Sequence, residues 1–250
     1  MNRNAIFFFL IIVACSILLI NGVHAKHNYT TESILFTKKA DLTNDAEDET
    51  IQLKGIPFSG GGSYYKETEL IVLLANGNRI QTTLTGGKSG TVEIKDLNGD
   101  KRKDLLIKIP IDPEKDTYEY FLYSVKNNKL MEWPIPKPVY VEGHFDHHYN
   151  ALIKVNNHAT YQKINLSKHK KTYENLGIYH HGILNEPREV MVSDYLDLSP
   201  VRMKNGKFGI KGVQKVFGPI ENDAIATVTS IWSYHPKKEW MLEKTSLHIE

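Results

Sequence analysis

The chain has 250 residues, 41% of them hydrophobic and 24% charged, and its 31 Lys and Arg against 29 Asp and Glu leave a formal net charge of +2. This composition suffices for the core of one domain or two small ones, and it excludes a disordered tail, a collagen and a multi-span membrane protein. The near-neutral charge also lacks the basic excess with which proteins bind phosphate backbones, so we expect no nucleic-acid partner.

Residues 1–25 have the pattern of an export signal. Arg3 precedes an uncharged run, AIFFFLIIVACSILLI, and Val23 and Ala25 place small residues three before and one before the Ala25/Lys26 bond. This is the arrangement that signal peptidase accepts. We therefore predict a protein that is secreted or held at the cell envelope, with a signal peptide cleaved after Ala25.

Two other outcomes for this segment stay open. The apolar run is longer than a typical signal core, so the segment could remain as an uncleaved membrane anchor. Residues 12–15 (IVAC) resemble a bacterial lipobox, which would make Cys15 the lipidated residue of a lipoprotein, although the chain stays apolar after it. Membrane attachment is expected through this segment only. Because Cys15 is the only cysteine, no disulfide can form within the cleaved chain.

After the signal, turn sequences alternate with short apolar runs. The predicted strands cover residues 69–74, 79–84, 118–125, 151–155, 224–232 and 239–249, and the predicted hairpin turns are 75–78, 126–129, 156–157, 181–182, 204–207 and 236–238. Several of these turns contain Asn-Gly or Asn-Asn, which tolerate the positive φ of tight hairpins. The sequence predicts a mainly β fold of antiparallel meanders, in propeller-like or sandwich units with little helix.

Helical signal is confined to residues 166–176, which end before Gly177, and residues 185–187 and 198–200 read as turns. Residues 133–138, WPIPKP, should be stiff and extended, because proline fixes φ and disfavours helix in the residue before it. We expect this segment to join a β-domain of residues 33–131 to a β-rich C-terminal half of residues 139–250, either as two domains or as one continuous structure.

An internal repeat lies in the first of these parts. Residues 41–51 (DLTNDAEDETI) align with residues 96–106 (DLNGDKRKDLL) at a constant offset of 55. Both copies read D-L-[TN]-x-D-x-x-x-[DE] and continue into an apolar strand. A repeat of this length is typical of blades or other repeated β-units.

The residue types in each copy point to a calcium loop. Counting the first Asp as position 1, oxygens at positions 1, 3, 5 and 9 and the carbonyl of position 7 can surround one hard cation, and Ca²⁺ prefers six to eight such ligands. The repulsion among several carboxylates also favours a cation between them. The predicted ligands are Asp41, Thr43, Asp45, the Glu47 carbonyl and Glu49 in the first loop, and Asp96, Asn98, Asp100, the Arg102 carbonyl and Asp104 in the second.

This pattern resembles the calcium loops of FG-GAP and VCBS-type repeats, which lie between strands of integrin-like β-propellers. The resemblance covers about residues 33–131, and the C-terminal half resembles only loosely small secreted proteins of Gram-positive spore-formers. The chain departs from the family at position 6, where Ala46 and Lys101 replace the usual Gly, and at position 3 of the first loop, where Thr43 stands. An EF-hand is excluded because position 12 holds Gln52 and Ile107 rather than Glu.

A cation here would be structural, because protein oxygens would fill its coordination shell. The same residues also suit plain polar turns, in which Asp and Asn bind their own backbone. No nucleophile motif and no Gly-rich phosphate loop is present, so we expect no enzyme activity, no catalytic residues and no cofactor other than Ca²⁺. The expected role is binding or structural, with an extracellular or envelope partner that the sequence does not identify.

The competing hypothesis is a metal-dependent hydrolase built on residues 143–149, GHFDHHY. In a strand, His144, Asp146 and His148 would share one face, and with His180 or His181 they could hold Zn²⁺. A polar outer face of a sheet explains the same residues.

Overall fold

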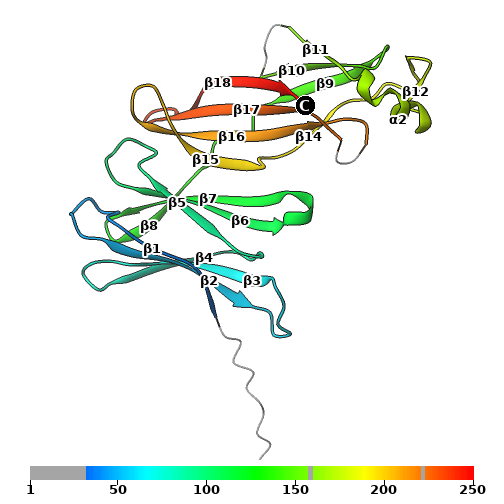
Figure 1. The fold of residues 1–250 in the computed structure, drawn as a ribbon. Helices are drawn as coiled ribbons and strands as arrows, with labels where there is room; N and C mark the ends of the chain where they lie inside the picture. Colours follow the sequence, from blue (N-terminus) through cyan, green and yellow to red (C-terminus); the bar gives the residue numbers. More distant parts are fainter. Residues whose placement is uncertain (1–31, 157–159, 221–222) are drawn as a thin grey trace, which may run out of the picture. The chain divides into compact units, whose positions relative to one another are not determined.

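The computed structural model describes residues 32–156, 160–220 and 223–250, which all belong to one compact unit (Figure 1). The predictions for residues 1–25, including lipidation at Cys15, lie outside these ranges, as does Asn157 of one predicted turn. In the part that is described, no helix has the length and apolar character needed to cross a membrane.

The first sheet is an antiparallel meander in which each strand pairs with the next along the chain. Its turn between the third and fourth strands is the predicted Asn-Gly turn, and Gly77 there has φ +87°. Because β2 alternates buried and half-buried residues, one of its faces packs into the core. The strands are β1 (Ser33–Ala40), β2 (Glu49–Pro57), β3 (Tyr65–Leu73) and β4 (Arg79–Thr85).

The second sheet repeats this meander with the same order and direction of strands. A short 3-10 helix, η1 (Pro113–Lys115), connects its second and third strands. The strands are β5 (Thr91–Lys95), β6 (Asp104–Asp112), β7 (Thr117–Lys126) and β8 (Lys129–Trp133).

The two meanders extend the sequence repeat to four strands each. β6 begins and ends 55 residues after β2, whereas β7 begins 52 residues after β3 and β8 begins 50 residues after β4. The connections are shorter in the second copy, so the constant offset is lost beyond the second strand. This is why the sequence pattern shows only the loop and the strand that follows it.

The C-terminal half forms two further sheets and a small hairpin. A three-stranded sheet has the order β11-β10-β9, and in a five-stranded sheet β14 and β15 both pair with β16, which is followed by β17 and β18. The strands are β9 (Val141–Asp146), β10 (Asn150–Val155), β11 (Gln162–Asn165), β12 (Tyr179–His180), β13 (Ile183–Leu184), β14 (Met191–Val192), β15 (Asp197–Arg202), β16 (Phe208–Phe217), β17 (Ala224–His235) and β18 (Glu239–Ile249).

Helix is scarce, as the sequence predicts. Within the described ranges, α2 (Lys170–Asn175) is the one α-helix, and it directly follows the 3-10 helix η2 (Ser167–His169). Both lie in the predicted helical segment, and Gly177 has φ +68° just after it. The mainly antiparallel β fold with little helix is therefore confirmed.

One predicted turn is wrong. Residues 198–200 do not turn but lie inside β15, where Pro200 is opposite Ile210 of β16. β15 pairs with β16 alone, so the missing N–H of Pro200 breaks no second ladder. Proline is tolerated in edge strands for this reason.

Hydrophobic clusters on both faces of the second sheet link the two halves. Along β6, Leu105 and Ile107 pack in a cluster with residues of the first sheet, whereas Leu106 packs with Leu198 and Ile210 of the C-terminal half. Alternate residues of a strand point to opposite faces, so one strand serves two cores. A third cluster packs the three-stranded sheet and Tyr173 of α2 with β16 and β17.

The proline-spaced segment, residues 133–138, forms hydrogen bonds with the C-terminal half. The Trp240 indole N–H donates to the Pro134 carbonyl at 2.7 Å, and the Tyr195 hydroxyl donates to the Lys137 carbonyl at 2.9 Å. The buried Gln214 side chain accepts from the Val139 N–H at 3.0 Å. These contacts hold in place a stretch of backbone that, after Trp133, belongs to none of the described strands until β9.

Candidate functional site

The two acidic loops occupy equivalent places in the two meanders. Residues 41–48 connect β1 to β2, and residues 96–103 connect β5 to β6. In each copy the acid at position 9 is the first residue of the following strand, Glu49 in β2 and Asp104 in β6. Each loop is therefore anchored at its end to a central strand of its sheet.

In the first loop, carboxylate oxygens accept hydrogen bonds from the loop's own backbone. Asp41 accepts from the N–H of Asn44 at 2.6 Å and from the N–H of Ala46 at 3.1 Å. Asp45 accepts from the Glu47 N–H at 2.9 Å. These bonds curl the loop around the side chain at position 1.

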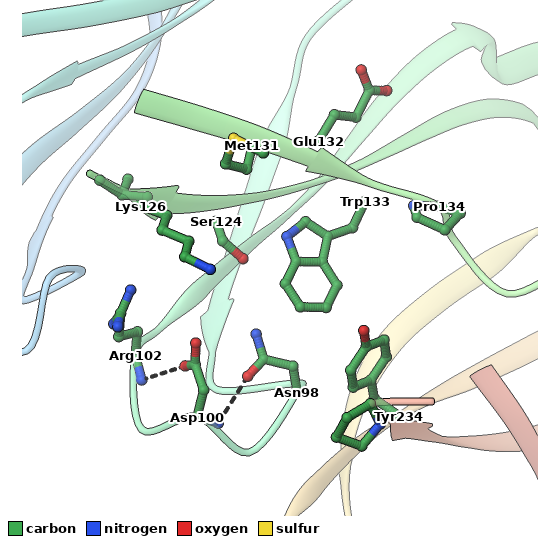
Figure 2. Close-up of a pocket in the computed structure, with 12 residues that line it drawn as sticks. Asn98, Asp100, Arg102, Ser124, Lys126, Met131, Glu132, Trp133, Pro134 and Tyr234 are labelled. Atoms are coloured by element: carbon green, nitrogen blue, oxygen red, sulfur yellow. Dashed lines mark hydrogen bonds between the residues drawn. The ribbon is translucent and has the colours of Figure 1, made fainter. Parts of the chain in front are cut away.

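The second loop has the same bonds at the same positions. Asp96 accepts from the N–H of Gly99 at 2.6 Å and from the N–H of Lys101 at 3.0 Å. Asp100 accepts from the Arg102 N–H at 2.9 Å, and Figure 2 shows this bond on the wall of a pocket. The two loops thus share one backbone arrangement, although six of the nine residues differ between them.

The backbone has positive φ at positions 4 and 6 of both loops. Asn44 and Gly99 occupy position 4, with φ +62° and +80°, and Ala46 and Lys101 occupy position 6, with φ +70° and +75°. A residue with a Cβ at such a φ costs roughly 1–2 kcal/mol. Ala46 and Lys101, in place of Gly at position 6, therefore strain the backbone of both loops.

The acid at position 9 is buried in both loops. Glu49 is 1% exposed and accepts from the Leu42 N–H at 2.7 Å, and Asp104 is 2% exposed and accepts from the Leu97 N–H at 2.8 Å. Asp104 also accepts from the Asn98 side-chain amide at 3.2 Å and from the Ser124 hydroxyl. Each loop is thereby closed by a carboxylate in the core.

Burial raises the pKa of Asp104 from 3.8 to about 6, against the opposing effect of the hydrogen bonds from Ser124 and the Leu97 N–H. The nearby charges of Asp100 and Asp96 raise this pKa further. Burial and the two neighbouring acids therefore disfavour the ionised form of Asp104. A cation in the loop would supply that charge and favour the ionised form.

Position 3 differs between the loops. Asn98 accepts from the Asp100 N–H at 2.8 Å through its side-chain oxygen. The corresponding Thr43 hydroxyl is buried and has no hydrogen-bond partner among the described residues. A buried hydroxyl without a partner is unfavourable, so this oxygen is suited to a ligand that the protein does not itself supply.

Sequence reasoning missed two side chains at the second loop. Ser124 comes from β7, where it is the one polar residue in the apolar run from Phe121 to Val125. Lys207 comes from the β15–β16 turn, and its ammonium nitrogen lies 3.4 Å from the position of an ideal Cβ built on Gly99. A polar Ser in an apolar strand indicates a buried hydrogen-bond partner and could have been noticed in the sequence. Nothing in the sequence relates Lys207 to Gly99.

The predicted histidine site does not form as expected. β9 ends at Asp146, and His148 lies in the β9–β10 turn with φ +60°, so the strand alternation does not reach it. The His144 ring instead packs against Tyr161, with 5.6 Å between ring centroids. The β12–β13 hairpin does approach this turn, because the His148 N–H donates to the Gly182 carbonyl at 2.6 Å.

The described ranges contain no group of three or more His, Cys, Asp or Glu side chains arranged to hold a metal ion. This statement covers the acidic loops as well as the histidines. In both loops the position 1 carboxylate binds backbone N–H groups through both of its oxygens.

Residues 139–248 match the family model described as the YybI C-terminal domain. The match begins directly after the proline-spaced segment and covers less than half of the chain. No curated protein and no solved structure matches the chain. The C-terminal half is thus similar to the YybI C-terminal domain, and the repeat with its two acidic loops lies outside the matched residues.

Proposed function

We propose that this chain is a non-enzymatic β-protein of the cell exterior or envelope, in which the two acidic loops hold Ca²⁺ as a structural ion. The observation that carries the proposal is that the acids at positions 1, 5 and 9 accept the same backbone hydrogen bonds in both loops, each loop being closed by a buried carboxylate. One such loop would be an ordinary turn. Two loops that differ in most residues but keep an acid at positions 1, 5 and 9 favour a shared ligand.

The donor set suits Ca²⁺. The predicted ligands in both loops are all oxygens, which hard cations prefer, and neither set includes a nitrogen or sulfur ligand. Thr43 supplies a buried hydroxyl without a hydrogen-bond partner among the described residues, and Asp104 supplies a buried carboxylate beside two other acids. Bound calcium would neutralise these acids and tie each loop to the start of the central strand β2 or β6.

The proposed place outside the cytoplasm rests on the sequence of residues 1–25. The membrane contact we propose is confined to that segment, and the partner is an extracellular or envelope molecule. The match to the YybI C-terminal domain carries no part of this proposal.

The test is a thermal melt of residues 26–250 in EDTA and after addition of calcium, magnesium or zinc. A ligand at 100 times its dissociation constant stabilises the folded state by about 2.7 kcal/mol. For a chain of this size that corresponds to a rise of about 5–10 °C in the melting temperature. We expect this rise with calcium and a smaller one with magnesium.

Two substitutions separate a calcium loop from a plain turn. Asp45→Asn and Asp100→Asn keep the side-chain oxygen that accepts from the backbone but remove the charge. Each should melt like the parent in EDTA and lose part of the calcium-induced rise. The matched control is Asp48→Asn in the same loop, because Asp48 is an exposed acid outside the predicted ligand set. It should keep the full rise.

Three results would count against this proposal. Calcium without effect on the melt, or a rise that survives in the Asp45→Asn/Asp100→Asn double variant, would reduce both loops to turns. A rise selective for zinc would favour the alternative, an extracytoplasmic metal-dependent hydrolase using His144, Asp146 and His148.

A further inference from the structure

A cavity of about 460 Å³ lies beside the second acidic loop (Figure 2). Its volume is in the range of small-molecule binding sites in proteins. Three separate parts of the chain form its walls: the loop itself, the β7–β8 hairpin with the start of the proline-spaced segment, and the β17–β18 turn. Its lining includes Asn98, Asp100, Lys126, Trp133, Tyr234 and Pro236.

One wall of this cavity, called the cleft below, is aromatic, and its rings are held in place by contacts behind it. The rings of Trp133 and Tyr234 meet edge to face with centroids 4.9 Å apart, and Tyr234 meets Trp240 in the same way at 5.6 Å. Trp240 in turn donates its indole N–H to the Pro134 carbonyl. A wall fixed in this way presents ring surface with little loss of side-chain entropy on binding.

The opposite wall is polar and carries both signs of charge. Asp100, Arg102 and Lys126 line it together with the Asn98 amide. In Figure 2 the Lys126 side chain extends toward Asp100, and the Trp133 ring faces the space between Asn98 and Tyr234. This wall mixes hydrogen-bond donors and acceptors.

Several polar groups in the cleft are free for a ligand. Among the described residues, no hydrogen-bond partner is found for the Trp133 indole N–H, the Tyr234 hydroxyl or the Lys126 ammonium group, whereas the indole N–H groups of Trp232 and Trp240 both have one. The cleft thus differs from the other tryptophan environments of the molecule.

We propose that this cleft binds a neutral oligosaccharide of pyranose units. The C–H face of such a ring packs on an aromatic side chain, and each hydroxyl can donate to Asp100 or Asn98 while accepting from Lys126 or Trp133. A polyanion would need a concentration of basic groups that the cleft lacks. An apolar peptide would leave the charged wall without partners.

This inference goes beyond the calcium proposal and does not require it, although Asp100 belongs to both sites. The experiment is a calorimetric titration of residues 26–250 with chitotetraose and with cellotetraose, each in EDTA and in calcium. We expect saturable binding of at least one of them at millimolar concentration in both conditions. Binding without a calcium-induced rise in the melt would overturn the calcium proposal alone.

Variants locate the binding. Lys126→Ala changes an exposed side chain of the cleft and should weaken binding several-fold with an unchanged melting temperature. Lys129→Ala is the matched control, because Lys129 is exposed on the same hairpin but does not line the cleft. Trp133→Phe keeps a ring, loses the N–H and should also weaken binding.

Absence of binding by both tetrasaccharides would overturn the inference. So would equal binding by the parent, Lys126→Ala and Trp133→Phe, since the sugar would then bind elsewhere. Binding of a proline-rich peptide in place of the tetrasaccharides would assign the cleft to a different ligand class.

Discussion

Replacing Asp104 by Asn should remove the pH dependence that this buried carboxyl imposes on stability. The pKa of Asp104 is raised in the folded state, from 3.8 to about 6, chiefly by burial. The folded protein therefore keeps this proton at pH values where the unfolded chain has lost it. Stability from the protonated group is fully present below about pH 4 and is lost as the pH rises to about 6.

The size of the loss follows from the same pKa. A rise of about two pKa units, at about 1.4 kcal/mol each, corresponds to about 3 kcal/mol in the absence of a cation. Asn at this position cannot ionise. It carries a separate and constant cost, because the Leu97 N–H and the Asn98 amide are donors that the new amide nitrogen cannot satisfy, and only the Ser124 hydroxyl could accept from it.

The assay is urea unfolding of the parent and of Asp104→Asn in EDTA at several pH values from 4 to 7, followed by tryptophan fluorescence. The difference in unfolding free energy between them should change by about 2 kcal/mol over that range, because part of the total is already lost at pH 4, with the parent losing stability as the pH rises. A difference that stays constant, or a parent that gains stability with pH, would refute the reasoning. Calcium at pH 7 should offset the loss, because a cation favours the ionised form.

Two substitutions test the packing. Gly212→Ala should lower the unfolding free energy by about 1–3 kcal/mol, because the added methyl group would overlap the Tyr195 ring. Gly60→Ala should melt like the parent, because an ideal Cβ built on Gly60 meets no atom within 4 Å. Equal melting temperatures for the two variants would contradict the expected overlap at Gly212. Gln214→Leu leaves the Val139 N–H without its buried acceptor and should cost about 1–3 kcal/mol by urea unfolding. Unchanged stability there would show that the linker does not depend on this bond.

Much of the local structure could be predicted from the sequence, because turn residues determine the backbone conformation of their own neighbourhood. The Asn-Gly turn at residues 76–77 and the Asn-Asn turn at residues 127–128 join neighbouring strands where the sequence predicts them. The failures came where tertiary position overrode local chemistry. Pro200 lies in a strand because β15 is at an edge, and His148 lies in a turn because β9 ends two residues earlier.

The acidic loops could also be predicted, because the hydrogen bonds within them join residues seven or fewer positions apart. Asp96 and Asp100 bind N–H groups within their own loop, and the second copy at a constant offset marks the pattern. The hydrogen bond from Ser124 to Asp104 and the proximity of Lys207 to Gly99 could not be predicted from the sequence. Ser124 lies on β7, 20 residues after Asp104, and Lys207 lies in the β15–β16 turn, more than 100 residues after Gly99.

The sequence by itself determined the β class, the tandem loops and their strands, because alternation, turn residues and repeat spacing are local properties. Only the tertiary structure decided that the repeat extends to two whole meanders and that β6 serves two cores. It also decided that Trp133 and Tyr234, 101 residues apart, share one cleft with the second loop. Such contacts depend on how the faces of separate sheets pack, and alternation shows which residues share a face but not which face it meets.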